Sequence, residues 1–132
     1  MIVVDAGVVA NAVGDDGQDG RAARAVLRTA GGAAAPDLVD VETVAVLRRR
    51  WLAGAFTARR FAAAVEDLQQ LPFDRHPCLA LLRRAYELRA NITAYDAVYV
   101  ALAEAFGCDL VTVDGRLARA AGPRCDIVVL TP

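Results

Sequence analysis

Short apolar segments alternate with longer helical segments along this chain, and this alternation limits the fold more than any other feature of the sequence. Residues 2–4 and 110–113 are apolar and rich in β-branched side chains, which predicts two buried strands. Residues 33–35 and 127–130 are predicted to form two further strands. Because apolar strands separated by helices are typical of a parallel sheet covered on both faces, we predict an α/β fold with four to five parallel strands.

The segments between the strands have the apolar spacing of amphipathic helices. Gly54 and Gly107 are expected to end two of these helices, and Asp37 stands where an N-cap belongs. Helices are expected over residues 8–13, 20–30, 38–53, 57–70, 77–90, 93–106 and 116–120, with a connection or short strand over 71–73. A length of 132 residues supplies one hydrophobic core, so residues 1–132 are expected to form a single domain.

All fifteen basic residues are Arg, and the absence of Lys excludes several classes of α/β protein. P-loop NTPases need the Lys of their phosphate-binding loop. Response-regulator receivers and haloacid-dehalogenase-like phosphatases also use a Lys beside the phosphoryl group. The net charge of −1 gives the chain as a whole no general attraction for nucleic acid.

The sequence predicts a soluble, cytoplasmic protein with no membrane association. No segment approaches the roughly 20 apolar residues of a membrane span, and no secretory signal is visible. The three cysteines, Cys78, Cys108 and Cys125, fit no zinc-binding spacing and are expected to be reduced thiols.

Two acids stand at the carboxyl ends of the two clearest strands, where parallel sheets bind their ligands. Asp5 follows residues 2–4, and Asp114 follows residues 110–113. Both are therefore candidate site residues. Each also has an alternative interpretation as the N-cap of the next helix, and Asp114 with Gly115 is typical of a turn.

Two further acids lie on helix faces that are expected to point inward. Glu42 falls within an apolar stripe made of Leu38, Val41, Ala45 and Val46. A carboxylate there is costly unless it is paired, although an edge position or an Arg partner would also explain it. Asp96 begins the stripe of Tyr99, Val100 and Ala103. Thr93 and Asp96 also match a capping box, so capping is the alternative for this acid.

On a parallel sheet these four acids would converge on one crevice. Like charges about 4 Å apart repel by roughly 4 kcal/mol at an effective dielectric near 20, so such a cluster needs protons or cations. Oxygen ligands without His favour hard cations over zinc. We therefore predict a Mg²⁺ or Mn²⁺ site formed by Asp5, Glu42, Asp96 and Asp114.

Four segments together resemble the PIN-domain family, in particular the ribonuclease toxins of VapBC-type toxin–antitoxin modules. They are residues 2–6 (IVVDA), 35–42 (APDLVDVE), 93–103 (TAYDAVYVALA) and 110–114 (LVTVD). The third segment is the most specific, and the resemblance covers nearly the whole chain in order. It implies that the four acids are the family's catalytic quartet, which holds one or two Mg²⁺ or Mn²⁺ ions, and that Thr112 supports this site.

Two positions depart from the family pattern. Gly7 stands where many members have Ser or Thr, so one supporting hydrogen bond is expected to be missing, and Asn11 is a candidate to replace it in part. Arg116 stands where some relatives have an additional acid. Metal affinity and the number of ions depend on these two differences, whereas the quartet itself is intact.

The resemblance implies a Mg²⁺- or Mn²⁺-dependent endoribonuclease that hydrolyses RNA phosphodiester bonds, acts as a toxin and is blocked by a cognate antitoxin. It also implies a homodimer. The metal would activate a water as nucleophile, so no protein nucleophile is needed, and the lone His76 is expected in a loop with an exposed or structural role. The substrate is expected to be an unstacked RNA loop. Candidates for phosphate contact, or else members of a solvated helix face, are Arg48, Arg49, Arg50, Arg59 and Arg60.

The antitoxin is expected to lie against the helices between residues 38 and 70, with Trp51 and Phe61 as anchors, although both side chains also suit a core. Two other functions remain alternatives on the sequence alone. One is a non-catalytic PIN-like module whose acids bind metal or a basic partner. The other is a nuclease directed at DNA.

Overall fold

A sheet of five parallel strands forms the centre of the molecule. The computed structural model describes residues 1–131, with strands β1 (Ile2–Val4), β2 (Ala33–Pro36), β3 (Asp74–His76), β4 (Asp109–Thr112) and β5 (Ile127–Val129). Their order across the sheet is β3-β2-β1-β4-β5. All four pairings are parallel. The predicted α/β fold with a parallel sheet is therefore confirmed.

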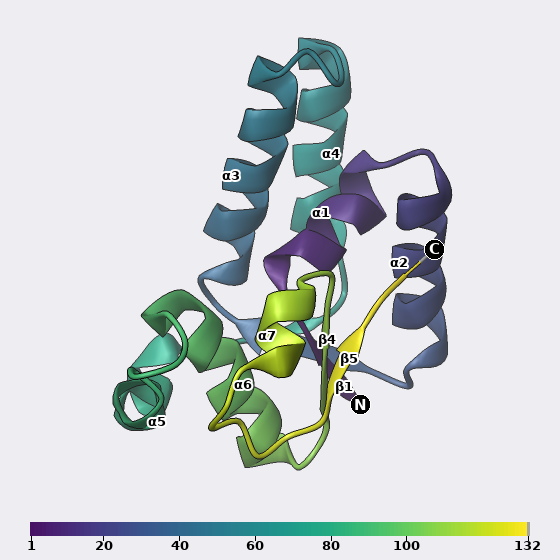
Figure 1. The fold of residues 1–132 in the computed structure, drawn as a ribbon. Coiled ribbons are helices and arrows are strands. Elements are labelled where there is room, and N and C mark those ends of the chain that lie inside the picture. The colour runs from purple at the N-terminus through teal and green to yellow at the C-terminus, as the bar shows by residue number, and fades with distance from the viewer. Residues whose placement is uncertain (132) are drawn as a thin grey trace.

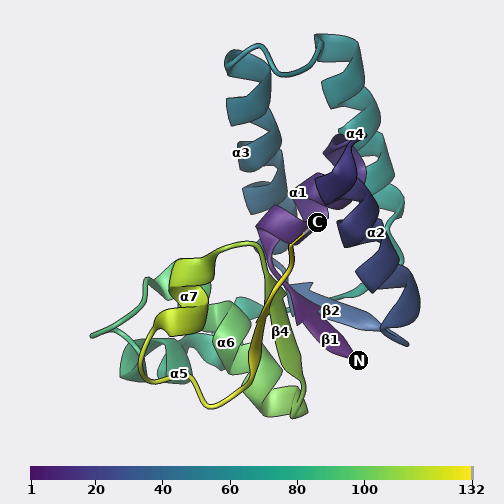
Figure 2. The same ribbon diagram turned by 45° about the vertical axis from the view of Figure 1, so that its right-hand side comes forward.

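Helices cover both faces of this sheet (Figures 1 and 2). They are α1 (Ala6–Gly14), α2 (Gln18–Thr29), α3 (Val39–Leu52), α4 (Ala58–Gln70), the 3₁₀ turn η1 (Cys78–Leu81), α5 (Leu82–Glu87), α6 (Ala94–Phe106) and α7 (Gly115–Arg119). Helices α1 to α4 lie on one side, and α5 and α6 lie on the other. The pair α3–α4 extends beyond the sheet as a long hairpin, which Figure 2 shows clearly.

The core is densest where β1 and β4 lie side by side. Val3, Val4 and Leu110 are completely buried, and full burial of such side chains contributes roughly 1.5–3 kcal/mol each. Helix α6 lies against these strands and β2. Its Val100 and Ala103 are also completely buried. Strand β1 is therefore held from both sides, and the position of the residue that follows it is well defined.

Arginine side chains tie the end of α1 to the neighbouring helices. Arg50 of α3 donates a hydrogen bond to Oδ1 of Asn11 at 2.5 Å. Arg60 of α4 donates to the carbonyl of Val13 at 3.0 Å, and Arg24 of α2 donates to two further carbonyls at the same helix end. These bonds satisfy carbonyls that the helix itself leaves free, and they place positive charge at its C-terminus.

Residues 71–73 form a connection, one of the two expectations for this segment, and the short strand β3 begins directly after them. This edge strand consists of Asp74, Arg75 and His76, and its polar side chains hide it from an apolar pattern. His76 therefore lies in a strand rather than a loop, with its ring 4.9 Å from that of Phe106. Asp37 is not the N-cap of α3, because Leu38 occupies that position.

The face of α3 that is buried differs from the predicted stripe. Val39, Thr43 and Leu47 face the interior, whereas Val41 is 74% exposed. The reason is that α3 packs mainly against α1 and α4, and a helix in contact with two neighbours is not limited to its most apolar stripe. Glu42 consequently lies beside the buried face rather than within it, where a carboxylate is half-buried.

The cysteines and the membrane prediction can be compared directly with the structure. Cys78, Cys108 and Cys125 are unpaired and half-buried, as expected for free thiols. Within residues 1–131, none of the helices has the length and apolar character that crossing a bilayer requires.

Leu47 is expected to be a major contributor to stability, because its side chain is completely buried beside α1. Leu47→Ala should lower the free energy of unfolding by about 2–5 kcal/mol. Leu52→Ala is the matched control on the same helix, since Leu52 is 58% exposed, and it should cost less than about 0.5 kcal/mol. Urea unfolding of both variants measures the difference, and equal costs would contradict the packing described above.

Candidate active site

The pairing of β1 with β4 brings two of the predicted acids to one edge of the sheet. Val4 lies opposite Val111 in the register, and the N–H of Asp5 donates to the carbonyl of Val111 at 3.2 Å. Asp5 follows β1 and Asp114 lies two residues beyond β4. Both strands run in the same direction, so both acids lie at their carboxyl ends, where parallel sheets bind ligands.

Thr112 links these two acids through a single hydroxyl group. Its Oγ1 donates to Oδ2 of Asp5, and it accepts the backbone N–H of Asp114 at 3.0 Å. The side chain is completely buried. Because a hydroxyl has one proton to donate, this arrangement fixes the orientation of the Asp5 carboxylate relative to the backbone of Asp114.

Asp5 and Asp114 also cap the helices that follow them, as the alternative interpretation proposed. Oδ1 of Asp5 accepts the N–H of Val8 at 3.1 Å, and Oδ1 of Asp114 accepts the N–H of Arg116 at 2.9 Å. Capping uses one oxygen of each carboxylate. Within residues 1–131 no donor reaches Oδ2 of Asp114, so capping does not account for the whole side chain.

Glu42 comes from the first turn of α3 and is held by Tyr99 of α6. The Tyr99 hydroxyl donates to Oε1 of Glu42 at 2.7 Å, and Tyr99 is almost fully buried. Tyr99 lies on the inward face, as predicted, but its contact with Glu42 was not predicted. A signal was present, because a buried Tyr requires a hydrogen-bond partner and this one lies three residues after Asp96.

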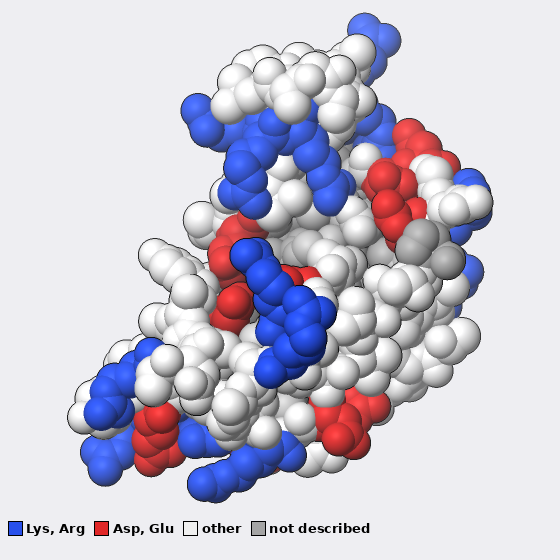
Figure 3. Space-filling model, in the orientation of Figure 1, with Lys and Arg blue, Asp and Glu red and all other residues white. Residues whose placement is uncertain are grey.

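Asp96 lies in the first turn of α6, and its environment combines both sequence interpretations. Thr93 caps the helix by accepting the N–H of Asp96 at 3.2 Å, as the capping box predicts. Tyr99, Val100 and Ala103 are buried on the inward face. Asp96 is half-buried at the open end of that face. Asp5, Glu42 and Asp96 are near enough to affect one another's pKa, and Asp114 is near enough to raise the pKa of Asp96. Figure 3 shows acidic side chains in a hollow between α3 and α7.

Burial and mutual repulsion both disfavour the charged forms of these acids. Loss of hydration raises the pKa of Asp5, and the charge of Asp96 raises it further, against the lowering effect of its hydrogen bonds. Burial likewise raises the pKa of Glu42, and both Asp96 and Asp5 add to the shift. The pKa of Asp96 is raised by burial and then by Asp114. Three of the four groups therefore carry unfavourable negative charge that a cation would offset.

The donor set fits a hard divalent cation in its chemistry, although the carboxylates are not yet arranged around one point. In residues 1–131, no three His, Cys, Asp or Glu side chains are grouped closely enough to hold an ion together. The available donors are all carboxylate oxygens, which suit Mg²⁺ or Mn²⁺. No donor within residues 1–131 occupies Oε2 of Glu42. The residues present therefore fit such an ion in the chemistry of their donor atoms.

Comparison with known proteins decides the family. The family model described as PIN domain matches residues 2–123. The chain belongs to the PIN-domain family. Ribonuclease VapC9 of Mycobacterium tuberculosis is 43% identical to it over 133 residues, which cover 98% of each protein. Ribonuclease VapC1 of the same species is 38% identical over 95% of this chain and 94% of its own length. The predicted resemblance is confirmed.

Solved structures share the same fold at lower sequence identity. VapC20 of M. tuberculosis, described as a sarcin–ricin loop cleaving toxin, has a TM-score of 0.68 and 19% identity over 90% of this chain and 94% of its own. FitAcB of Neisseria gonorrhoeae has a TM-score of 0.63 and 16% identity over 97% and 96%. These similarities show that the solved structures share the fold of this chain.

The two departures from the PIN-domain pattern have clear structural settings. A Cβ atom at Gly7 would lie 2.6 Å from Cγ2 of Val113, so packing leaves no room for Ser or Thr unless Val113 moves. Asn11, the candidate to replace this contact in part, accepts a hydrogen bond from Arg50 through its Oδ1. Arg116 extends beside the acids, with Nε 3.5 Å from Oδ1 of Asp114 and 87% of its side chain exposed.

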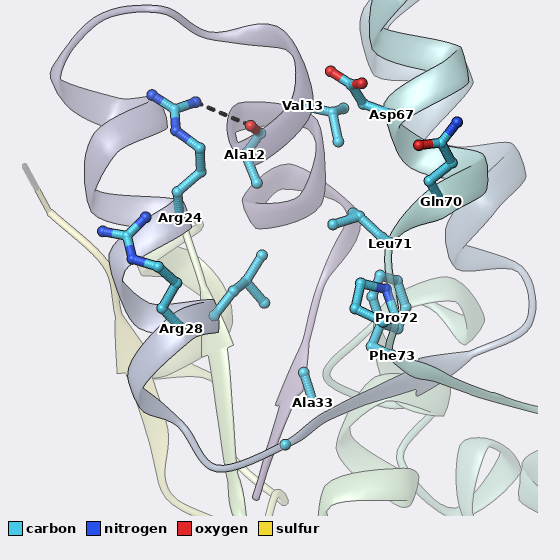
Figure 4. A pocket seen from close by; sticks show the side chains of 12 residues that line it. Ala12, Val13, Arg24, Arg28, Ala33, Asp67, Gln70, Leu71, Pro72 and Phe73 are labelled. Carbon is cyan, nitrogen blue, oxygen red and sulfur yellow. Dashed lines mark hydrogen bonds between the residues drawn. The ribbon is translucent and has the colours of Figure 1, made fainter.

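Another cavity of this PIN domain, of about 580 Å³, is remote from the acids. It lies between α2 and the end of α4, with Arg24 and Arg28 on one wall and Asp67 and Gln70 on the other (Figure 4). Arg24 is already bonded to carbonyls near the end of α1. The quartet and not this cavity is therefore the candidate active site.

Asp5→Asn is expected to raise the melting temperature of the PIN domain in the presence of a chelator. Asn can still cap α1 through its one carbonyl oxygen, and its amide N–H can donate to the Thr112 hydroxyl, whereas the buried charge is removed. Since the pKa of Asp5 lies above its ordinary 3.8, the folded protein binds more protons than the unfolded chain in the pH range just above that value. Wild-type stability therefore falls as the pH rises through that range, so the gain should be largest at neutral pH and vanish below about 3.8.

Asp16→Asn is the matched control for this measurement by circular dichroism. Arg60 lowers the pKa of the exposed Asp16, so removal of this charge should bring no gain. A lower melting temperature for Asp5→Asn than for the wild type at neutral pH would contradict the account of Asp5.

The bridging hydroxyl of Thr112 is expected to contribute to stability beyond its packing. Thr112→Val keeps the shape of the side chain but leaves Oδ2 of Asp5 without its donor and the N–H of Asp114 without an acceptor. The cost should be about 1–3 kcal/mol in urea unfolding. Thr112→Ser retains the hydroxyl and should recover most of that loss, and a Val variant as stable as the Ser variant would refute the bridge.

Proposed function

We propose that this PIN domain is a Mg²⁺- or Mn²⁺-dependent endoribonuclease that acts as the toxin of a type II toxin–antitoxin system. The observation that carries the proposal is the set of four carboxylates at the carboxyl edge of the sheet, with the pKa values of Asp5, Glu42 and Asp96 raised. The full-length similarity to proteins named ribonucleases supports it.

The four acids come from different elements of the fold, so together they can surround one cation. We assign the metal and catalytic roles to Asp5, Glu42, Asp96 and Asp114. When bound there, Mg²⁺ or Mn²⁺ supplies activation of a water molecule and stabilisation of charge on the reacting phosphate. Thr112 orients the carboxylate of Asp5, and Tyr99 orients that of Glu42. Because these two contacts already orient the carboxylates, binding a cation costs them less side-chain entropy.

Exposed arginines near the crevice are suited to bring the negatively charged substrate to an acidic site. Of the five arginines considered in the sequence, Arg50 and Arg60 are used within the fold. Arg48, Arg49 and Arg59 are exposed and remain available for phosphates. The positive charge of Arg49 also lowers the pKa of Glu42 slightly against the larger effect of burial, which places this arginine near the acids.

The α3–α4 hairpin is the surface that we assign to the antitoxin. Trp51 is 40% exposed and Val41 is 74% exposed, whereas Phe61 is half-buried beneath Trp51 with ring centroids 6.2 Å apart. Exposed apolar side chains on a projecting hairpin are suited to an apolar face of a partner. Trp51 is thus the better anchor, and Phe61 supports it. A homodimer and a cytoplasmic location belong to the same proposal by family resemblance.

The proposal predicts metal-dependent cleavage of single-stranded RNA by the purified protein without a partner. Cleavage should require Mg²⁺ or Mn²⁺ and stop when EDTA is added. Asp5→Asn and Asp96→Asn should each lower the rate by at least about 100-fold, since even indirect changes to metal sites cost 10–100-fold. Gel analysis of labelled RNA gives the rates, and parallel single- and double-stranded DNA substrates test the alternative of a DNA-directed nuclease.

Asp74→Asn is the matched control for this assay. Asp74 is exposed and is the first residue of the edge strand β3, so it lies at the amino ends of the strands and away from the acids. Its loss should therefore leave the rate unchanged. If the wild type cleaves none of a broad panel of RNAs with either metal, the enzyme proposal fails and a non-catalytic module is favoured. If both site variants cleave at the wild-type rate, the assignment of the acids is wrong.

A further inference from the structure

A cleft lies beside the acidic crevice. The inference about its ligand rests on the proposed ribonuclease function. A cleft of about 490 Å³ opens directly from Asp96 and Asp114. One wall is the segment between α5 and α6, which includes Asn91 and Ile92, and the other is α7 with Leu117. The cleft thus continues the candidate active site in one direction.

The walls of this cleft combine three kinds of chemistry. Leu117 is buried and Ile92 is half-buried, so they give the cleft an apolar floor. Arg89 and Arg116 add two guanidinium groups at its margin, and Asn91 adds an exposed amide. An apolar surface, an amide and paired cations match the base face, the base edge and the phosphate of a nucleotide.

Arg89 is already held in position by its own neighbours. Its guanidinium lies 4.1 Å from the ring centre of Tyr86, and it donates to the carbonyl of Tyr86 at 3.1 Å. Stacking on an aromatic ring restricts a side chain that is otherwise flexible. It leaves other donors of the guanidinium available for a phosphate, because Arg has five N–H groups.

Arg116 completes the margin from the opposite wall. Its Nε faces Asp114, whereas 87% of the side chain is exposed, and no acceptor within residues 1–131 bonds its terminal nitrogens. In the view of Figure 3, basic side chains over α7 lie directly in front of the acidic hollow. A phosphate between the two arginines would therefore lie next to the acids on the path of an RNA strand.

Asn91 lies where a base edge would reach. Gly122, which has a positive φ of 108°, approaches the Asn91 side chain closely, and a Cβ atom there would lie 3.6 Å from its Nδ2. Gly122 therefore lies beside the amide, and no protein group within residues 1–131 forms a hydrogen bond with that amide. An amide with both a donor and an acceptor free can distinguish one base from another.

We propose that this cleft binds one unpaired ribonucleotide adjacent to the cleaved phosphodiester, with its base on Ile92 and Leu117 beside Asn91. Its phosphate lies between Arg89 and Arg116. The cleft makes the enzyme selective for the nucleotide flanking the cleavage position, in addition to any contacts made by α3 and α4. Single-stranded RNA is the substrate that can place a base there, because a paired base is held within its helix.

Binding is tested first, without any requirement for cleavage. The four ribonucleoside 3′-monophosphates are titrated into the ¹⁵N-labelled protein with Mg²⁺, and amide shifts are followed by NMR. Shifts should appear at residues 91–93 and 117, differ among the four bases, and exceed those caused by inorganic phosphate. Arg89→Gln and Arg116→Gln should each weaken binding about tenfold, the loss expected for one charge-assisted hydrogen bond.

Matched controls lie outside the cleft on the same two helical regions. Arg83 is 88% exposed on α5 and Arg119 is exposed on α7. Arg83→Gln and Arg119→Gln should leave the affinity unchanged. Equal weakening in these variants, or identical shifts with inorganic phosphate alone, would overturn the proposal in favour of general anion binding.

Cleavage of an RNA library randomised around the cut position then separates this inference from the proposed function. Asn91→Ala should remove most of the difference in cleavage rate between the preferred base and the other bases on one side of the cut. Cleavage with unchanged preference, and without nucleotide shifts in the cleft, overturns the cleft and leaves the ribonuclease standing. Base-dependent nucleotide binding in the cleft without cleavage by the wild type overturns the ribonuclease and retains the binding site.

Discussion

The parallel pairing of β1 with β4 is the constraint on which the rest of the site depends. It brings two residues more than a hundred positions apart to the same edge of one sheet, and the hydroxyl of Thr112 then joins their side chain and backbone. Helices α3 and α6 add the other two acids from the two opposite faces of the sheet. A change in the register of this one pairing would separate Asp5 from Thr112, so Oδ2 of Asp5 would lose its donor and the Thr112 hydroxyl its acceptor.

The negative charge gathered at this edge of the sheet is unfavourable, and the stability of the adjacent core offsets its cost. Three acids with raised pKa values lie beside some of the most completely buried side chains, including Val3, Val4 and Leu110. Their burial stabilises the fold by several kcal/mol, which offsets repulsion among the carboxylates. This distribution is typical of functional sites, where charge is concentrated at a local cost that packing elsewhere balances.

Much of this architecture could be predicted from the sequence, and the reasons are local. Apolar runs identified β1 and β4 because central strands are buried on both faces, and helix stops such as Gly107 adopt the positive φ that favours Gly. Strand β3 was not predicted at Asp74–His76, because an edge strand can be polar and then lacks an apolar pattern. The prediction of the buried face of α3 was wrong, because contacts with α1 and α4 decide which face is buried, rather than the most apolar stripe of the helix.

The candidate site shows the same division between local and long-range information. The positions of Asp5, Asp114 and Asp96 at strand and helix ends are features of neighbouring residues, and the sequence carries them. The Tyr99–Glu42 hydrogen bond joins residues 57 positions apart, and the engagement of Asn11 by Arg50 spans 39. Such pairings depend on how helices pack side by side, which periodicity in a single sequence does not encode.

Helix α3 has a mechanical consequence for this molecule. It carries Glu42 in its first turn and Trp51 near its other end, nine residues away, a separation of about 14 Å along a helix that rises 1.5 Å per residue. An uninterrupted helix moves as a rigid rod over this length. A protein bound to the exposed tip of the hairpin therefore also restricts the motion of the Glu42 carboxylate, with which it has no contact.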